Sequence, residues 1–128
     1  MTDPFKTHGA FSWNELMTSD PVAAKEFYRQ LLGWEMEEMS MENMTYTVVK
    51  AAGEAIGGIM NIPPEASGAP PHWGAYITVD NVDQTASFAE SLGGKIMMAP
   101  RDIPGVGRFA VIQDPLGAVV SLITYSME

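Results

Sequence analysis

The chain has 128 residues, no cysteine and a formal net charge of -9 at pH 7. Hydrophobic residues make up 46% of it and charged residues 18%, a mixture typical of one globular domain. The negative charge repels phosphate, which argues against binding to nucleic acid or to anionic membranes. The lack of cysteine excludes disulfides and thiolate ligands. Since no long apolar run is present, we expect a soluble, cytoplasmic protein.

The first half of the chain predicts a strand, a helix and three more strands, in that order. Residues 11–18 read as the first strand. Asp20 can cap a helix, Pro21 suits its first position and Gly33 suits its left-handed end. The residues expected on the inner face of this helix are Ala24, Phe27, Tyr28, Leu31 and Leu32. The three later strands are expected at 35–40, 44–51 and 56–62.

The second half repeats the same order of elements. A strand is expected at 74–79, a helix from Asn81, and strands at 95–100, 108–113 and 117–124. The inner face of the second helix is expected at Thr85, Phe88, Ala89 and Leu92, each 61 residues after its counterpart in the first. Such an offset indicates an internal repeat. Residues 63–72 form a Pro-rich linker between the two halves.

Each half thus reads βαβββ, which predicts an α+β fold. We expect a single domain over residues 1–128, with a first module at about 11–62 and a second at about 73–125. A lone βαβββ module leaves one face of its sheet without a helix. Two modules can form a curled mixed sheet around a concave pocket, with the helices outside.

Three segments of the chain resemble the vicinal oxygen chelate superfamily, which contains the glyoxalases, the bleomycin-resistance proteins and the extradiol dioxygenases. They are SWNELMTSDPVAAKEFYRQLLGWE, WGAYITVDNVDQTASFAESLGGKI and PGVGRFAVIQDPLGAVVSLI. The W-N-E-L opening and the VGRFAVIQDPLGA block are most similar to the glyoxalase-like branch. The resemblance covers nearly the whole chain and implies the paired βαβββ fold.

The resemblance also implies four positions that hold metal ligands in the metal-using members. Here those positions carry Trp13, Met60, Gly74 and Ser121. A divalent cation needs several converging imidazole or carboxylate groups, and these four residues do not supply them. We therefore expect neither a metal nor another cofactor. A displaced metal site would have to use Glu15 and His72. Alternation along a strand places Glu15 on the same face as Trp13, and His72 on the same face as Gly74.

Glu15 is the candidate catalytic residue, as a general base within an apolar pocket. The alternative is a structural carboxylate that is hydrogen-bonded to the backbone, to Tyr46, to Tyr76 or to Arg108. Aromatic and thioether groups suit an adaptable ligand pocket. The residues expected to line it are Trp13, Met17, Tyr46, Met60, His72, Tyr76, Phe109 and Ser121.

Three functions remain open from the sequence. The first is a metal-independent binding protein of the glyoxalase and bleomycin-resistance type, with a small apolar or aromatic ligand in the concavity. The second is a glyoxalase-related lyase or isomerase, which uses either displaced metal ligands or Glu15 as a metal-free base. The third is an interaction module that receives a segment of another protein. A small-molecule ligand and a second copy in a homodimer are the expected partners.

Overall fold

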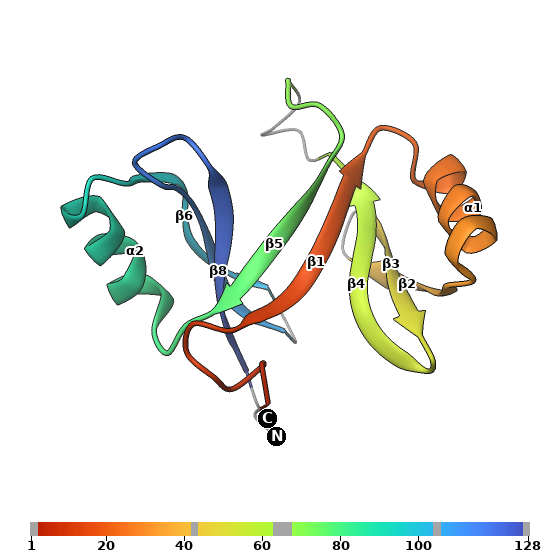
Figure 1. Ribbon diagram of the computed structural model, residues 1–128, viewed down its shortest axis with the longest axis horizontal. Helices are drawn as coiled ribbons and strands as arrows, with labels where there is room; N and C mark the ends of the chain where they lie inside the picture. Colours follow the sequence, from red (N-terminus) through yellow and green to blue (C-terminus); the bar gives the residue numbers. More distant parts are fainter. Residues whose placement is uncertain (1–2, 42–43, 63–67, 104–105, 127–128) are drawn as a thin grey trace. The chain divides into compact units, whose positions relative to one another are not determined.

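A computed structural model describes residues 3–41, 44–62, 68–103 and 106–126. Over these residues the chain forms, in order, β1 (Phe11–Thr18), α1 (Pro21–Leu32), β2 (Glu35–Met41), β3 (Met44–Ala51), β4 (Glu54–Asn61), β5 (His72–Thr78), α2 (Val82–Ser91), β6 (Lys95–Ile103), β7 (Gly107–Gln113) and β8 (Val119–Tyr125) (Figure 1). Two consecutive βαβββ runs and the α+β class are thus confirmed. In this part of the chain no helix is long and apolar enough to cross a membrane.

The strands of the α1 unit, defined below, are hydrogen-bonded in the order β2-β3-β4-β1, and those of the α2 unit in the order β5-β8-β7-β6. The parallel pairs are β1 with β4 and β5 with β8. The hairpins that join β2 to β3, β3 to β4, β6 to β7 and β7 to β8 are antiparallel. Each half therefore has the same internal topology, as the repeat predicted.

The chain divides into two compact units. One is Asn14–Gly74, here called the α1 unit, and the other combines Met1–Trp13 with Ala75–Glu128 and is called the α2 unit. The N-terminal segment thus belongs with the second half of the chain. Residues 63–67 of the expected linker lie outside the described residues, and His72, expected at its end, is the first residue of β5.

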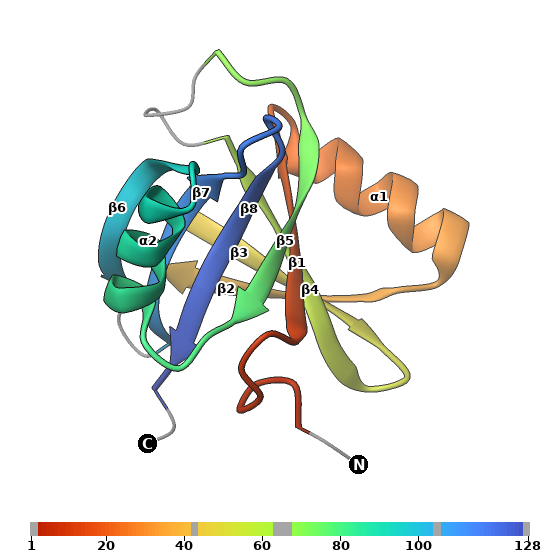
Figure 2. The same cartoon turned by 60° about the vertical axis from the view of Figure 1, so that its left-hand side comes forward.

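In the α1 unit, the helix begins and ends where its capping residues predict. The Asp20 side chain accepts a hydrogen bond from the Ala23 backbone N–H at 3.0 Å, and Gly33 ends the helix in the left-handed region with φ of 73°. The core on the α1 side of the sheet contains the buried residues Leu16, Val49 and Ile59, packed against Ala24 and Tyr28 of the helix among others. One face of this sheet is therefore closed by α1 (Figure 2).

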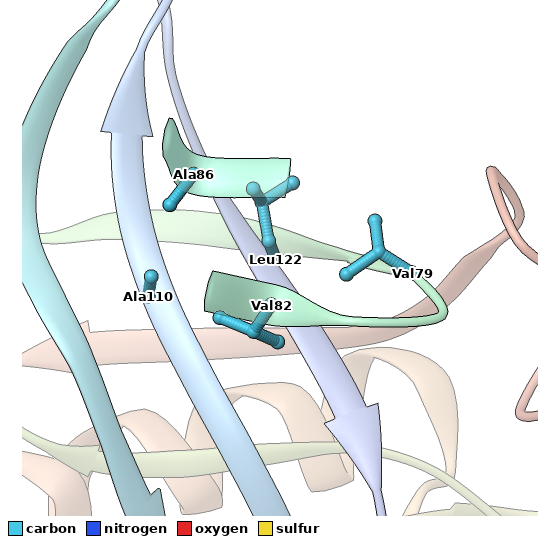
Figure 3. Close-up of a cluster of buried hydrophobic side chains, with 5 residues drawn as sticks. All are labelled: Val79, Val82, Ala86, Ala110 and Leu122. Atoms are coloured by element: carbon cyan, nitrogen blue, oxygen red, sulfur yellow. The ribbon is translucent and has the colours of Figure 1, made fainter. Parts of the chain in front are cut away.

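In the α2 unit, the core lies between α2 and its own strands. Val82 and Ala86 of the helix contact Val79, Ala110 and Leu122 of the sheet side, as Figure 3 shows. Ala86 is 1% exposed and Ala110 is fully buried, so the helix approaches the sheet through small side chains. The helix was expected from Asn81, and the structure shows that Asn81 caps it, because its side chain accepts from the Gln84 N–H at 3.0 Å.

The expected inner faces of the helices were wrong at five large residues, of which Leu32 is 53% exposed. Phe27 and Leu31 are 58% and 60% exposed, and their repeat partners Phe88 and Leu92 are 62% and 63% exposed. The apolar arc of each helix is wider than the stripe that touches the sheet, and the packed stripe is carried by smaller residues such as Ala86. Helical spacing alone does not tell which edge of a wide apolar arc faces inward.

Candidate functional site

The sheet of the α1 unit has a second face, opposite α1. Leu16 on β1 and Ile59 on β4 belong to the core beneath the helix. Because side chains alternate along a strand, Glu15 projects from the opposite face, on which Gly58 also lies. No helix of the described residues in this unit covers that face, which is here called the helix-free face. Glu15 and Gly58 are direct neighbours in the parallel β1–β4 register.

Glu15 is held on this face by a tyrosine from a more distant strand. The Tyr46 hydroxyl donates a hydrogen bond to Glu15 Oε2 at 2.8 Å, and Glu15 is only 7% exposed. Tyr46 lies on β3, Glu15 lies on β1, and β4 runs between them. The ring therefore crosses β4, and it does so at Gly58, where a Cβ would overlap the tyrosine hydroxyl. Of the possible partners for Glu15, Tyr46 is one that the structure supplies.

Two methionines that we expected to line the ligand pocket lie near the Glu15–Tyr46 pair on β1 and β4. Met17 and Met60 are partners in the β1–β4 register, and both are partly buried. Alternation places them on the same face as Glu15, where their thioethers extend an apolar surface.

His72 stands apart from this group. It is exposed at the start of β5, and its Nδ1 lies 2.8 Å from the Pro70 carbonyl oxygen. In the described ranges no three His, Cys, Asp or Glu side chains gather as a metal site would require. The residues expected at the ligand positions, Trp13, Met60, Gly74 and Ser121, contain no imidazole or carboxylate, and Gly58, which strand register puts in place of Met60, adds none. These residues do not fit a divalent cation.

The helix-free face of the α2 unit carries an aromatic pair. Ala110 on β7 and Leu122 on β8 point into the core under α2, so their neighbours Phe109 and Ser121 project from the other face. The Tyr76 and Phe109 ring centroids are 6.3 Å apart at an interplanar angle of 46°. Ser121 is the β8 partner of Tyr76 in the strand register. The structure thus brings three of the predicted ligand-lining residues together.

Strand register shows that the two helix-free faces are built alike. Glu15 and Tyr76 are repeat partners, and Gly58 stands beside the first as Ser121 stands beside the second. On the next strand, Thr47 is opposite Ile59 and Ala110 is opposite Leu122, so Tyr46 corresponds to Phe109. In the α1 unit, Tyr46 on β3 reaches Glu15 on β1 across Gly58 of β4. In the α2 unit, Phe109 on β7 meets Tyr76 on β5, and β8 with Ser121 runs between them. By register the counterpart of Ser121 is Gly58, with Met60 two residues further on.

The N-terminal segment contributes residues that sequence reasoning missed. Thr78 Oγ1 donates to the Pro4 carbonyl at 2.7 Å, and the Phe5 ring packs edge-on against Tyr125 with centroids 5.0 Å apart. A short irregular segment has no hydrophobic period, so nothing in its sequence signalled that it would pack. Trp13, a predicted lining residue, lies at the end of this segment and is partly exposed.

Arg108 is engaged in ion pairs on the helix side of the α2 unit. Its guanidinium donates to Asp83 Oδ1 at 3.0 Å, to Asp83 Oδ2 at 2.8 Å and to Asp102 Oδ1 at 3.1 Å. The hydrogen bonds from Arg108 hold the pKa of Asp83 below its usual value, and the same contacts raise the pKa of Arg108. A surface depression of about 230 Å³ around this cluster includes none of the predicted site residues.

Over the described residues this chain has two βαβββ modules, and each has its helix on one face of its strands. The chain is therefore a two-module α+β protein. The sequence profile described as Glyoxalase/Bleomycin resistance protein/Dioxygenase superfamily matches residues 10–122. The chain belongs to that superfamily.

Several named proteins are similar to this chain. A protein of Mycobacterium tuberculosis named "Putative glyoxylase CFP32" is 41% identical over 116 residues, which are 90% of this chain and 44% of that protein. The anthracycline biosynthesis protein DnrV of Streptomyces peucetius is 29% identical over 127 residues, 89% of this chain and 46% of that protein. The chain therefore spans less than half the length of these curated relatives.

Solved structures share the fold at low sequence identity. The crystal structure of methylmalonyl-CoA epimerase from Mycobacterium tuberculosis superposes with a TM-score of 0.66 at 16% identity, covering 96% of this chain and 91% of that one. A hypothetical protein from Bacillus halodurans gives a TM-score of 0.72 at 7% identity, covering 95% and 98%. At these identities the likeness concerns the fold alone.

Proposed function

We propose that this protein binds a small apolar or aromatic compound on its helix-free sheet faces, without a metal ion. The observation that carries the proposal is the pair of crossing contacts on those faces. Tyr76, which is 6% exposed, and Phe109 form an aromatic pair from the strands on either side of β8, and Tyr46 and Glu15 form a polar contact over Gly58. An apolar surface with a few placed polar groups is the usual composition of a small-molecule site.

The relatives support an aromatic ligand and leave its identity open. DnrV is named for anthracycline biosynthesis, and anthracyclines are fused-ring aromatic compounds that stack well on tyrosine and phenylalanine rings. The Mycobacterium relative is named as a glyoxylase, which supports an enzymatic role as a second proposal for this chain. Both relatives are more than twice as long as the part that this chain matches. An activity of the whole relative is therefore only a proposal for this chain.

A second candidate is a metal-free lyase or isomerase in which Glu15 is the general base. The observation that favours it is a carboxylate almost withdrawn from water and oriented by a tyrosine hydroxyl. Such a group can take a proton from a carbon next to a carbonyl when the substrate lies against it. Glu15 would hold that proton on one of its carboxylate oxygens and return it to a neighbouring carbon or oxygen. No observation favours the metal-dependent version through His72.

We also propose a cytoplasmic location and a homodimer, with a small molecule and not nucleic acid or a membrane as the ligand. The net charge of -9 supports the exclusion of nucleic acid. Twofold pairing is the commonest assembly of small proteins. Light scattering tests the dimer, and a mass of about 14 kDa at all concentrations would contradict it.

The binding proposal is tested by a thermal-shift and fluorescence screen of planar aromatic compounds. A hit should lose at least tenfold in affinity in Phe109→Ala, because stacking and burial against that ring are lost. Tyr76 is 6% exposed, so Tyr76→Ala should show the same loss when it is measured below the melting temperature of that variant. Phe88→Ala is the matched control, since that ring is 62% exposed on α2. Equal loss in the control, or no hit in a broad aromatic library, would contradict the proposal.

A further inference from the structure

The polar contact on the α1 unit depends on a residue with no side chain. Tyr46 reaches Glu15 by lying across β4 at Gly58, and the three atoms nearest to a Cβ added at Gly58 all belong to the Tyr46 ring and its hydroxyl. Gly58 has no positive φ, so its backbone is open to any residue. The glycine is therefore needed for space above the strand and not for a turn.

We propose that Gly58 and Tyr46 are positioning residues that hold Glu15, and that the held pair selects ligands bearing a hydrogen-bond donor such as an aromatic hydroxyl. Tyr46 donates its proton to Glu15, so a further group that reaches these oxygens meets them as hydrogen-bond acceptors. Donation to a carboxylate also polarises the tyrosine oxygen and strengthens it as an acceptor. A ligand group that can only accept gains nothing there.

The second unit indicates that this trio is not required by the fold. In the same register positions it carries Tyr76, Phe109 and Ser121, which make an aromatic contact in place of a polar one. The βαβββ topology is the same in both units. The same topology thus carries a polar contact in one unit and an aromatic contact in the other. The Glu15–Tyr46 pair is therefore set by the side chains of the α1 unit and not by the fold.

Substitution of Gly58 separates this proposal from a plain packing role. The colliding atoms are the far end of a side chain, so Gly58→Ala should fold with Tyr46 turned away from Glu15. Gly74→Ala is the matched control, because a methyl group there meets only Glu15 O, at an ordinary 3.8 Å. If Gly58→Ala is too unstable to study, the double variant with Tyr46→Ala should regain its melting temperature. Failure to regain it would overturn the proposal.

The direct readout is the NMR signal of tyrosine labelled with ¹³C at Cζ, which senses the hydrogen bond of each hydroxyl. Tyr46→Phe removes one signal and so assigns it. The assigned signal should shift in Gly58→Ala and in Glu15→Ala, and stay in place in Gly74→Ala. An unchanged Tyr46 signal in Gly58→Ala would show that the contact does not need the glycine, which overturns the positioning role.

The selectivity arm rests on the proposed function and uses 2-naphthol and naphthalene as probes. Tyr46→Phe and Gly58→Ala should each weaken 2-naphthol about tenfold and leave naphthalene within about twofold. Equal weakening of both probes would overturn the donor selectivity, as would unchanged 2-naphthol binding. If neither probe binds the wild type while the Tyr46 signal shifts as expected, the binding function and the donor selectivity fail and the positioning role stands.

Discussion

Ser121 is the strand neighbour of Tyr76, and the Phe109 ring meets the Tyr76 ring on the same face of the sheet. β8 lies between the strands that carry the two rings, so we expect a small residue at 121 to leave room for that contact, as Gly58 leaves room for Tyr46 in the other unit. We therefore expect that space accounts for the serine at this position of β8.

Ser121→Leu should separate the two rings, whereas Ser121→Ala should leave them in contact. We expect the leucine variant to lose about tenfold in affinity for an aromatic ligand and the alanine variant to stay within about twofold. Titration of an identified ligand, followed by fluorescence, measures both. An alanine variant as weak as the leucine variant would point to the hydroxyl as the important group.

A second prediction concerns metal content. The residues at the four ligand positions offer no imidazole or carboxylate, so protein purified without chelators should contain less than about 0.1 equivalent of divalent metal. Elemental analysis measures this directly. One equivalent of zinc, nickel or manganese that disappears in His72→Ala would establish a displaced site and contradict the metal-free function.

A third prediction follows from the ion pair between Arg108 and Asp83. Arg108 lowers the pKa of the Asp83 carboxyl in the folded protein, while in the unfolded chain that pKa is near 3.9. Stability from this pair is therefore present above about pH 4 and is lost as the pH falls through the lowered folded value. The wild type should be more stable than Arg108→Gln at pH 7, and the difference should shrink towards pH 2.

Urea unfolding from pH 2 to pH 8 measures that difference. Added salt at pH 7 should also reduce it, because both groups are solvent-exposed. A difference that stays constant down to pH 2 would show that Arg108 stabilises the protein through packing of its aliphatic stem and not through its charge.

The order of elements could be predicted because each boundary has a local physical cause. Asp20 and Asn81 cap their helices through side-chain oxygens, and the glycine at 33 takes the left-handed end. The repeat offset of 61 also relates the helix starts at Pro21 and Val82. These signals act within a few residues, so a single sequence is enough to find them.

The site could be predicted only as a set of strand faces. Alternation gave the faces of Glu15 and Tyr76, yet the register between strands depends on irregularities such as the shifts in β6 between Ile96 and Met98 and between Met98 and Arg101. The offset is 61 at the first strands and 63 at the third and last strands of each half, and Gly58 takes the place expected for Met60. Nothing in the sequence marks a glycine that a ring from another strand will cross.

A fourth prediction compares a buried residue with an exposed one. Ile59 is fully buried under α1, whereas Phe88 is 62% exposed. Ile59→Ala should lower the free energy of unfolding by about 3 kcal/mol, and Phe88→Ala should change it by less than about 1 kcal/mol. Denaturant titration of both variants decides the point. A larger cost for Phe88→Ala would show that its ring is covered in solution, as a dimer interface would cover it.

The last prediction is that Trp13 reports on the ligand. It is partly exposed near the start of β1, two residues before Glu15 on the same strand. Burial of an aromatic ligand against its ring gains about 25 cal/mol per Å², with stacking worth about 1 kcal/mol more. Trp13→Ala should therefore weaken binding by about 2 kcal/mol, near thirtyfold.

The other two tryptophans are natural controls. Trp34 stacks on Tyr28 with centroids 5.4 Å apart, and the Trp73 indole N–H donates to the Tyr28 hydroxyl at 3.2 Å, so both belong to one aromatic cluster within the α1 unit. Ligand-induced quenching should disappear in Trp13→Phe and persist in Trp34→Phe and Trp73→Phe. If Trp13→Ala instead unfolds the protein and no ligand changes its emission, Trp13 is a core residue and the proposed lining set is wrong at that position.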